Sequence, residues 1–411
     1  MGKIRILHLA DTHLGVETYG RIDPATGLNS RLLDFAVALD QAVDYALNGD
    51  VHLVVFAGDA YRSRDPNSTC QREFARRIWK LASQGIQVFL LVGNHDLPAA
   101  AGRANSVDIF ETLEVQNVHV GRKPGLYRIH TRAGPVQIVA LPWLSRSQVF
   151  TKEDQKNRTP DEINELVGAY VSSFVSRAAA ELDQIIPAVL VAHLSVMGAV
   201  WGSEKSVMLG QDFVVPRSLV ALPAFDYVAL GHVHRHQVLG NIPLTVYPGS
   251  LERIDFGEEK EDKGFVVVEL EKGSAEYDFH KVDARRFLTV EIAIRTDDPM
   301  PEILSCLEKQ DLAGAIVRVL IRTTEEREGS IQYNEIRRYL VSREVAHVAA
   351  ITKHVERKHR TVFSGKLAEE MTPLQALDLY LKNKQVSPDR AGVLMRYAGM
   401  MVQDVVQKGE P

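Results

Sequence analysis

Cysteine is scarce in this chain of 411 residues, which contains only Cys70 and Cys306, far apart in the sequence. Their spacing excludes a cysteine-based metal site, and we interpret both as reduced thiols of a cytoplasmic protein. The sequence has no run of about 18 uninterrupted apolar residues, so no membrane-spanning helix is predicted. The first residues lead directly into a strand-like segment, so no signal peptide is expected.

Positive charge is not in excess either, since 48 lysines and arginines face 53 aspartates and glutamates, for a net charge of -5. A dedicated, non-enzymatic nucleic-acid binder is usually basic, which argues against this class of protein. Any contact with nucleic acid must therefore depend on a local patch or on bound metal ions. Internal repeats and low-complexity segments are also absent, and the length suits two or three domains.

The N-terminal part alternates between short apolar runs and amphipathic segments. Strands are predicted at 3–10, within 51–59 and at 86–92, with helices at 31–47 and 68–83. This alternation favours a largely parallel sheet covered by helices. In such sheets the groups that perform chemistry gather beyond the carboxyl ends of the strands.

The middle part continues the same pattern. Strands are predicted at 136–141 and 188–192, with a helix at about 160–184 between them. Two further runs, near 244–247 and 264–271, are expected to form the antiparallel edge of a two-sheet sandwich. From about 287 onward, shorter strand-like and helix-like pieces alternate, which indicates a separate, small α+β domain.

The predicted fold class is therefore α/β: a two-sheet α/β sandwich core, a small α+β cap domain and a C-terminal helical tail. The predicted parts are a core at 1–283, a cap at 284–360, a linker at 361–371 and a tail at 372–411. The tail begins with a strong helix start, because Thr372 can act as N-cap, Pro373 occupies the first turn and Gln375 can complete a capping box.

Short polar clusters follow the apolar runs at several predicted strand ends. They are Asp11-Thr12-His13, Gly58-Asp59, Gly93-Asn94-His95-Asp96, His193 and Gly231-His232-Val233-His234. Together they supply the Asp, His and Asn side chains that can hold two hydrolytic metal ions, which in such sites lie roughly 3.5–4 Å apart. For any single histidine taken alone, a core or surface role is the better interpretation. The set as a whole predicts a phosphoester hydrolase.

Asp59 is the natural bridge between two ions, because one carboxylate has two oxygens and the preceding glycine permits a sharp turn. Asp11 and His13, two residues apart, can point the same way from a strand end. His232 and His234 have the same spacing.

Asn94 can offer a carbonyl oxygen, and His193 completes the ligand set. Nitrogen and oxygen ligands without cysteine fit manganese, iron or zinc better than magnesium or calcium alone. His95 is predicted to stabilise charge on the phosphate or to protonate the leaving oxygen, with Asp96 holding its imidazole in the right tautomer. The alternative is that His95 only packs the loop.

Six segments extend these clusters into longer motifs: LHLADTHLG, GDAYRSRDPN, LVGNHD, AHLSV, ALGHVHRHQ and YPGSLER. Together they resemble the SbcD family, bacterial relatives of the nuclease subunit of the DNA double-strand-break repair complex. The resemblance is strong over about residues 1–280 and extends to the remainder only in layout. Many phosphatases share the shorter motifs, whereas YPGSLER after the last histidine pair is more specific.

The resemblance implies two sets of metal ligands that share Asp59. The first set would be Asp11, His13, Asp59 and His234, and the second Asp59, Asn94, His193 and His232. His95 would stabilise the transition state. The family also implies two manganese ions (iron, magnesium or zinc being possible), exonuclease action on duplex ends and endonuclease action on single strands or hairpins. A homodimer and an SbcC-type ATPase with long coiled coils, together a heterotetramer, are the implied partners.

This chain departs from some relatives at Arg62, where they carry a histidine three residues after the bridging aspartate. An arginine cannot act as a general acid near neutral pH, but it can bind a phosphate. The densest basic stretch is residues 352–360, with further arginines upstream of it. Local positive charge of this kind favours binding to duplex DNA, because it releases counterions from the phosphates. The candidate DNA contacts are Arg62, Arg337, Arg338, Arg343, Lys353, Arg357, Lys358 and Arg360. The alternative for the basic stretch is a solvated helix face.

The tail helices carry apolar residues at helical spacing, which is typical of a surface that binds a partner. The candidate contacts with the ATPase are Leu374, Leu377, Leu381, Leu394, Tyr397 and Met401, unless the helices fold back onto the core. Candidate dimer contacts, by family analogy, come from helices near 68–83 and 104–114. They are Phe74, Ile78, Trp79, Ile109, Phe110 and Leu113, and packing within the chain explains them about as well.

The sequence thus predicts a manganese-dependent DNA nuclease subunit that acts in the cytoplasm, at the nucleoid. Two alternatives stay open. A metallophosphatase or cyclic-nucleotide phosphodiesterase could use the same site but would need neither a basic cap nor partner helices. A scaffold with dispensable catalysis is the other, against which the complete ligand set argues.

Overall fold

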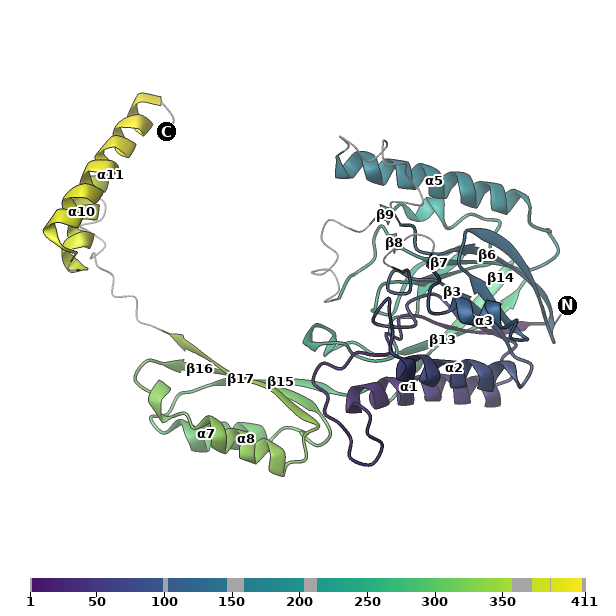
Figure 1. Ribbon diagram of the computed structural model, residues 1–411, viewed down its shortest axis with the longest axis horizontal. Coiled ribbons are helices and arrows are strands. Elements are labelled where there is room, and N and C mark those ends of the chain that lie inside the picture. The colour runs from purple at the N-terminus through teal and green to yellow at the C-terminus, as the bar shows by residue number, and fades with distance from the viewer. Residues whose placement is uncertain are drawn as a thin grey trace. The chain divides into compact units, whose positions relative to one another are not determined.

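The computed structural model describes residues 2–98, 103–145, 159–202, 213–356, 372–384 and 386–408. The chain forms two compact units (Figure 1). The first comprises Met1–Ile321 and Ser330–Lys353, and the second comprises Arg322–Gly329 and His354–Pro411.

The first unit contains two six-stranded sheets. The first sheet has the order β14-β13-β1-β2-β3-β4. Strands β1 to β4 run parallel, β13 runs antiparallel to β1, and β14 runs antiparallel to β13. Its strands are β1 (Ile4–Leu9), β2 (Leu53–Phe56), β3 (Gln87–Leu91), β4 (Val118–Gly121), β13 (Gly264–Glu271) and β14 (Ser274–Lys281).

The second sheet has the order β11-β12-β10-β7-β6-β5, with four parallel strands in the middle and an antiparallel strand at each edge. Its strands are β5 (Gly125–Thr131), β6 (Gly134–Leu141), β7 (Ala188–His193), β10 (Tyr227–Gly231), β11 (Gln237–Asn241) and β12 (Leu244–Tyr247). Two short strands, β8 (Ser195–Val196) and β9 (Val214–Val215), pair separately. Short 3-10 helices lie at Arg217–Leu219, Phe256–Glu258 and Glu328–Ser330.

The predicted antiparallel edge is wrong in one respect. The runs near 244–247 and 264–271 do not pair, because β12 lies parallel to β10 in the second sheet while β13 lies antiparallel to β1 in the first. The edge partner of β12 is β11, which is half-exposed and lacks the continuous apolar run that marked the buried strands.

Helices cover the outer faces of both sheets, so the core has four layers. α1 (Ser30–Asn48), α2 (Ser68–Ala82) and the short α3 (Asp108–Thr112) pack on the first sheet, and α5 (Pro160–Ala180) packs on the second (Figure 1). The inner faces of the two sheets pack against each other in an apolar cluster that includes Ile6, Val55, Ile138 and Val191. Because both faces of the central strands are covered, these strands are apolar throughout rather than alternating. The predicted α/β two-sheet sandwich is confirmed.

The small α+β part has a three-stranded sheet in the order β15-β16-β17, with two helices. Its elements are β15 (Phe287–Ala293), α7 (Pro299–Glu308), β16 (Ile316–Thr324), α8 (Tyr333–Ser342) and β17 (His347–Glu356). It has an apolar cluster of its own, which includes Ile303, Val319, Ile336 and Leu340. The predicted domain boundaries stay predictions.

The motif YPGSLER lies where the core meets this small part. The Arg253 guanidinium donates to the carbonyl oxygens of Glu261 and Arg285, at 2.7 and 3.2 Å. The neighbouring Arg285 pairs with Asp34 of α1. This end of the motif therefore has a structural role at the junction.

The second unit contains the tail helices α10 (Pro373–Asn383) and α11 (Pro388–Lys408). The predicted capping box is present, since Thr372 accepts from the Gln375 amide and the Gln375 side chain accepts from the Thr372 amide. Leu381 is only 4% exposed, so its prediction as a partner contact is wrong: it is buried within the chain. Leu374 and Leu377 are half-buried.

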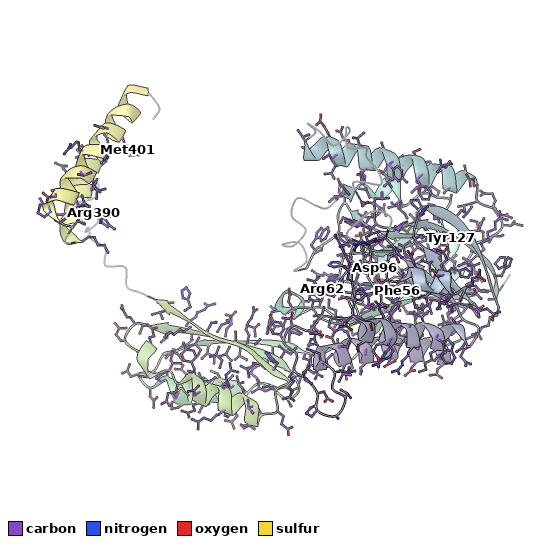
Figure 2. All side chains as sticks on the ribbon, in the orientation of Figure 1. Phe56, Arg62, Asp96, Tyr127, Arg390 and Met401 are labelled. Carbon is purple, nitrogen blue, oxygen red and sulfur yellow. The ribbon has the colours of Figure 1, made fainter. Side chains whose placement is uncertain are left out.

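The other predicted partner contacts lie on α11 and are exposed: Leu394, Tyr397 and Met401. Figure 2 labels Met401 on this helix. The predicted dimer contacts divide in the same way. Phe74, Ile78 and Phe110 are buried in the core, so their prediction as dimer contacts is wrong, whereas Trp79, Ile109 and Leu113 are exposed. None of the described helices is both long enough and apolar enough to cross a bilayer.

Candidate metal centre

The polar clusters converge at one edge of the two sheets. Asp11 and His13 follow β1, Asp59 follows β2, and Asn94 follows β3. From the second sheet, His193 ends β7 and His232 follows β10 directly. Because these strands are parallel within each sheet, their carboxyl ends meet, as the sequence predicted.

Asp59 lies between two groups of ligands. Its Oδ2 is 3.7 Å from His13 Nε2 and 3.5 Å from His193 Nε2. Its Oδ1 accepts from the backbone amide of His95 at 2.8 Å, which fixes the carboxylate between them. This position supports the prediction that Asp59 is the shared ligand.

We call the group formed by Asp11, His13 and His234 the closed side. Their ligand atoms lie within 4.8 Å of one another, and all three side chains are buried. His13 Nε2 and His234 Nε2 are 3.0 Å apart. Asp11 accepts from the backbone amide of His232, which ties the two sheets together at this point.

We call the group formed by Asn94, His193 and His232 the open side. Asn94 Oδ1 is 3.0 Å from His193 Nε2 and 3.1 Å from His232 Nδ1. His193 Nδ1 donates to the carbonyl oxygen of Ala57 at 2.7 Å, since a carbonyl can only accept. The Nε2 atom of His193 is therefore the one that can bind a cation.

The backbone is strained at the candidate ligands. Asp11, His13, Asp59 and His232 have φ angles of 52°, 43°, 57° and 103°, in the region that residues with a side chain rarely adopt. Strained residues persist where the surrounding structure over-determines them, and they cluster at functional sites. Here the amides of Asp11 and His13 donate to the carbonyls of Gly58 and Asp59, which holds two strained segments against each other.

The protonation states fit a cation site. Although burial alone would lower it, the Asp59 carboxylate raises the pKa of His193 to about 9. Burial lowers the pKa of His13 well below its usual value, so this imidazole is neutral. Without a metal ion, the Asp59 carboxylate thus favours the protonated form of His193, and a divalent cation would supply the same positive charge beside it.

The donor set fits two divalent cations. Two buried imidazole Nε2 atoms that face each other at 3.0 Å can share only one proton, and a cation would satisfy both lone pairs. Asp11, His13, Asp59 and His234 would hold one ion, and Asp59, Asn94, His193 and His232 the other.

The sequence did not predict the two residues that hold His234 in place, Glu258 and Lys263. His234 Nδ1 donates to Glu258 Oε1 at 2.8 Å, and Lys263 Nζ lies 2.8 Å from Glu258 Oε2. Burial alone would raise the pKa of Glu258, but the Lys263 ammonium outweighs it and holds that pKa far below its usual value. Both residues belong to a charged stretch that looks like an exposed loop in the sequence, so no signal marked them.

Asp96 does not orient His95, so that predicted role is wrong. Its buried carboxylate accepts from the backbone amides of Asp59, Ala60 and Gly93, at 2.9 to 3.1 Å. It therefore shapes the turns that carry the bridging and open-side ligands. His95 Nδ1 instead donates to the carbonyl oxygen of Arg62 at 2.9 Å.

Arg62 is exposed and lies next to the metal centre, in the core shown in Figure 2. The Arg62 charge adds to burial in lowering the pKa of His95. The other described candidates for DNA contact are all exposed on the small α+β part: Arg337, Arg338, Arg343 and Lys353. Arg357, Lys358, Arg360 and the predicted linker lie outside the described residues.

The fold and the paired ligand groups define a two-metal phosphoesterase. Residues 4–236 match the calcineurin-like phosphoesterase family, and the chain belongs to that family.

Similarity to individual proteins points to nucleases within this family. The chain is 27% identical to the SbcD component of the SbcCD nuclease of Rhodobacter capsulatus over 321 residues, which cover 74% of this chain and 76% of that protein. It is 24% identical to the same component of the SbcCD nuclease of Escherichia coli K12 over 277 residues, 66% of each chain. It is 23% identical to DNA double-strand break repair protein Mre11 of Archaeoglobus fulgidus over 377 residues, 84% of this chain and 76% of that one. The resemblance to the SbcD family is confirmed.

Proposed function

We propose that the chain is a metal-dependent DNA nuclease, the SbcD-type component of a double-strand-break repair enzyme that works in the cytoplasm at the nucleoid. One observation carries the proposal: Asp59 lies between two complete ligand groups, in a chain whose named relatives are repair nucleases. Two bound divalent ions, which we take to be manganese, supply Lewis-acid stabilisation of the phosphate and lower the pKa of water.

His95 is the proposed proton-transfer residue. Its Nδ1 proton is committed to the Arg62 carbonyl, so Nε2 is the atom that can exchange a proton with the leaving oxygen. The ring lies 4.9 Å from that of His13, edge to face, which places it beside the closed side. Burial lowers the pKa of His95, which favours rapid return to the neutral form after each transfer.

DNA would reach the centre past exposed positive charge. Arg62 is suited to bind a phosphate next to the scissile one, and Arg337, Arg338, Arg343 and Lys353 offer contacts on the small α+β part. Replacing Arg337 with glutamate should weaken DNA binding and lower its salt dependence. Arg128→Glu, on the exposed edge strand β5, makes the same charge change elsewhere and serves as the control.

The exposed face of α11 is the proposed contact with an SbcC-type coiled-coil ATPase. Leu394, Tyr397 and Met401 are 40%, 65% and 71% exposed, which is unusual for large apolar side chains. A homodimer through Trp79, Ile109 and Leu113 would complete a heterotetramer. Deleting residues 372–411 should abolish co-purification with the ATPase; retained binding would contradict this contact.

The decisive experiment compares DNA with a small ester. End-labelled duplex and hairpin DNA and a chromogenic phosphodiester are incubated with manganese, using wild type and His95→Asn. We expect DNA cleavage by wild type and a loss of about 100- to 10,000-fold in the variant, with two metal ions still bound. Hydrolysis of the small ester alone, also after addition of the ATPase, would favour a small-molecule phosphoesterase instead.

A further inference from the structure

Two of the chain's three tryptophans border the open side of the metal centre. Trp143, just after β6, has its ring 4.8 Å from that of His232, and Trp201, after β8, has its ring 5.5 Å from the same imidazole. Both are only half-buried. Two indoles from separate segments thus meet at one candidate metal ligand, in a site otherwise lined by carboxylate, amide and imidazole groups.

Backbone and side-chain contacts hold both tryptophans in place. The amide of Trp143 donates to the carbonyl of Val92 at 3.0 Å, directly before the turn that carries Asn94. The residue before Trp201 is held twice by Gln237, which accepts from the Val200 amide at 2.8 Å and donates to its carbonyl at 2.9 Å. Both half-buried indoles therefore project from backbone that is anchored by hydrogen bonds.

We propose that Trp143 and Trp201 form a stacking platform for an unpaired nucleobase next to the scissile phosphate. Because both indoles lie beside His232, a phosphate bound at the metal centre would bring its flanking nucleoside next to them. Base–aromatic stacking is a recurrent source of affinity for single strands, because every base offers a π face. This inference rests on the proposed function.

The platform specifies the form of the substrate. In a paired duplex both faces of a base are covered by its neighbours, so a base must leave the stack before an indole can cover it. A nucleotide that is frayed, mismatched or in a hairpin loop has already left the stack. The preferred cleavage point should therefore have an unpaired nucleotide beside it.

The test combines changes in the protein with changes in the DNA. Single-stranded oligonucleotides carry either a normal base or an abasic residue on each side of the scissile phosphate, and kcat/KM is compared for wild type, Trp143→Leu and Trp201→Leu. We expect each leucine variant to lose about tenfold on normal DNA relative to the small ester. Phenylalanine at the same positions should restore most of the loss.

The abasic substrate isolates stacking without a folding problem, because wild-type protein is used. It should lose a similar factor, and the leucine variants should lose little more on it, since base and indole belong to one interaction. Tyr170→Leu, at an exposed position of α5, is the control and should match wild type. Binding of oligonucleotide should quench the tryptophan fluorescence of wild type, and the quench should be smaller in Trp143→Leu and Trp201→Leu.

Three results would overturn the platform. The losses from the abasic residue and from leucine could multiply independently, or the leucine variants could lower hydrolysis of DNA and small ester by the same factor, as expected if the indoles only pack on His232. Wild type could also prefer fully paired ends. Failure of the proposed function looks different: wild type would hydrolyse the small ester but cleave no DNA, and the platform would fall with it.

Discussion

The two sides of the metal centre are supported in opposite ways. On the closed side, His234 donates to Glu258, whose charge is balanced by Lys263, and all three are buried. On the open side, His193 donates to a backbone carbonyl, and half-buried tryptophans flank His232. A charged carboxylate behind an imidazole makes that ligand more basic than a neutral carbonyl does.

This difference suggests a division of labour around Asp59. On the closed side, the carboxylate behind His234 makes that imidazole the stronger donor, which favours retention of the ion. The open side has neutral support, and its Asn94 is half-buried. We therefore expect tight metal binding on the closed side and weaker binding on the open side, where the ion can respond to substrate.

Removing the shared ligand should have the largest effect, because it affects both sides at once. Asp59→Asn keeps the shape but removes the charge that holds two cations together. Since the metal ions supply several kcal/mol of charge stabilisation, we expect kcat to fall by about a thousandfold or more. Metal analysis of the purified variant should show fewer than two ions per chain; two ions with normal turnover would remove Asp59 from the centre.

The next effect concerns the stability of the closed side. Lys263→Met leaves Glu258 as a buried charge without its main partner, and breaking such a pair costs about 3–5 kcal/mol. Urea unfolding of the metal-free protein should show this loss. Adding Glu258→Gln in the same chain should recover part of it, because the uncompensated charge is then gone. A double variant that is no more stable than Lys263→Met would argue against the pair as the cause.

The sequence predicted the candidate ligands of both sides but not the residues that support them. All seven candidate ligands follow apolar runs, and parallel strands bring such positions together. Glu258 and Lys263 could not be found in this way, because they lie in a charged stretch whose burial depends on packing after β12. Asp96 illustrates the same limit: its place beside His95 in the sequence suggested a pair, whereas the fold turns its carboxylate toward backbone amides.

The pairing of edge strands and the partners of exposed faces could not be predicted from the hydrophobic pattern. The buried parallel strands were recognised from continuous apolar runs. β11 and β14 are half-exposed edge strands, and their pairing is fixed by the sheet rather than by their composition. Helical spacing likewise predicted that Leu381 lies on an apolar face. The spacing does not show whether such a face packs within the chain or against a partner protein.

A change at the backbone of Gly58 should disturb the open side through His193. A β-carbon at Gly58 would lie 2.3 Å from His193 Nδ1, and its φ of 100° already disfavours a side chain. Gly58→Ala should therefore displace His193 and lower kcat about a hundredfold, as a shift of about 1 Å in a catalytic group can. Gly273→Ala is the matched control, because Gly273 has a φ of 85° but nothing within 4 Å. Equal losses in both variants would mean that backbone strain, not His193, is responsible.

The smallest effect should come from weakening the closed side without emptying it. Glu258→Gln retains an oxygen that can accept from His234, but it removes the negative charge behind the imidazole. Loss of such a supporting group typically lowers metal affinity about 10- to 100-fold. Titration calorimetry with manganese should show the tighter of two binding steps weakened toward the second, so that the steps merge. Glu261→Gln is the control, because Glu261 also pairs with Lys263, at 3.0 Å, but does not contact His234. If the weaker step changed instead, the open side would be the one that retains its ion, and the proposed division of labour would be reversed.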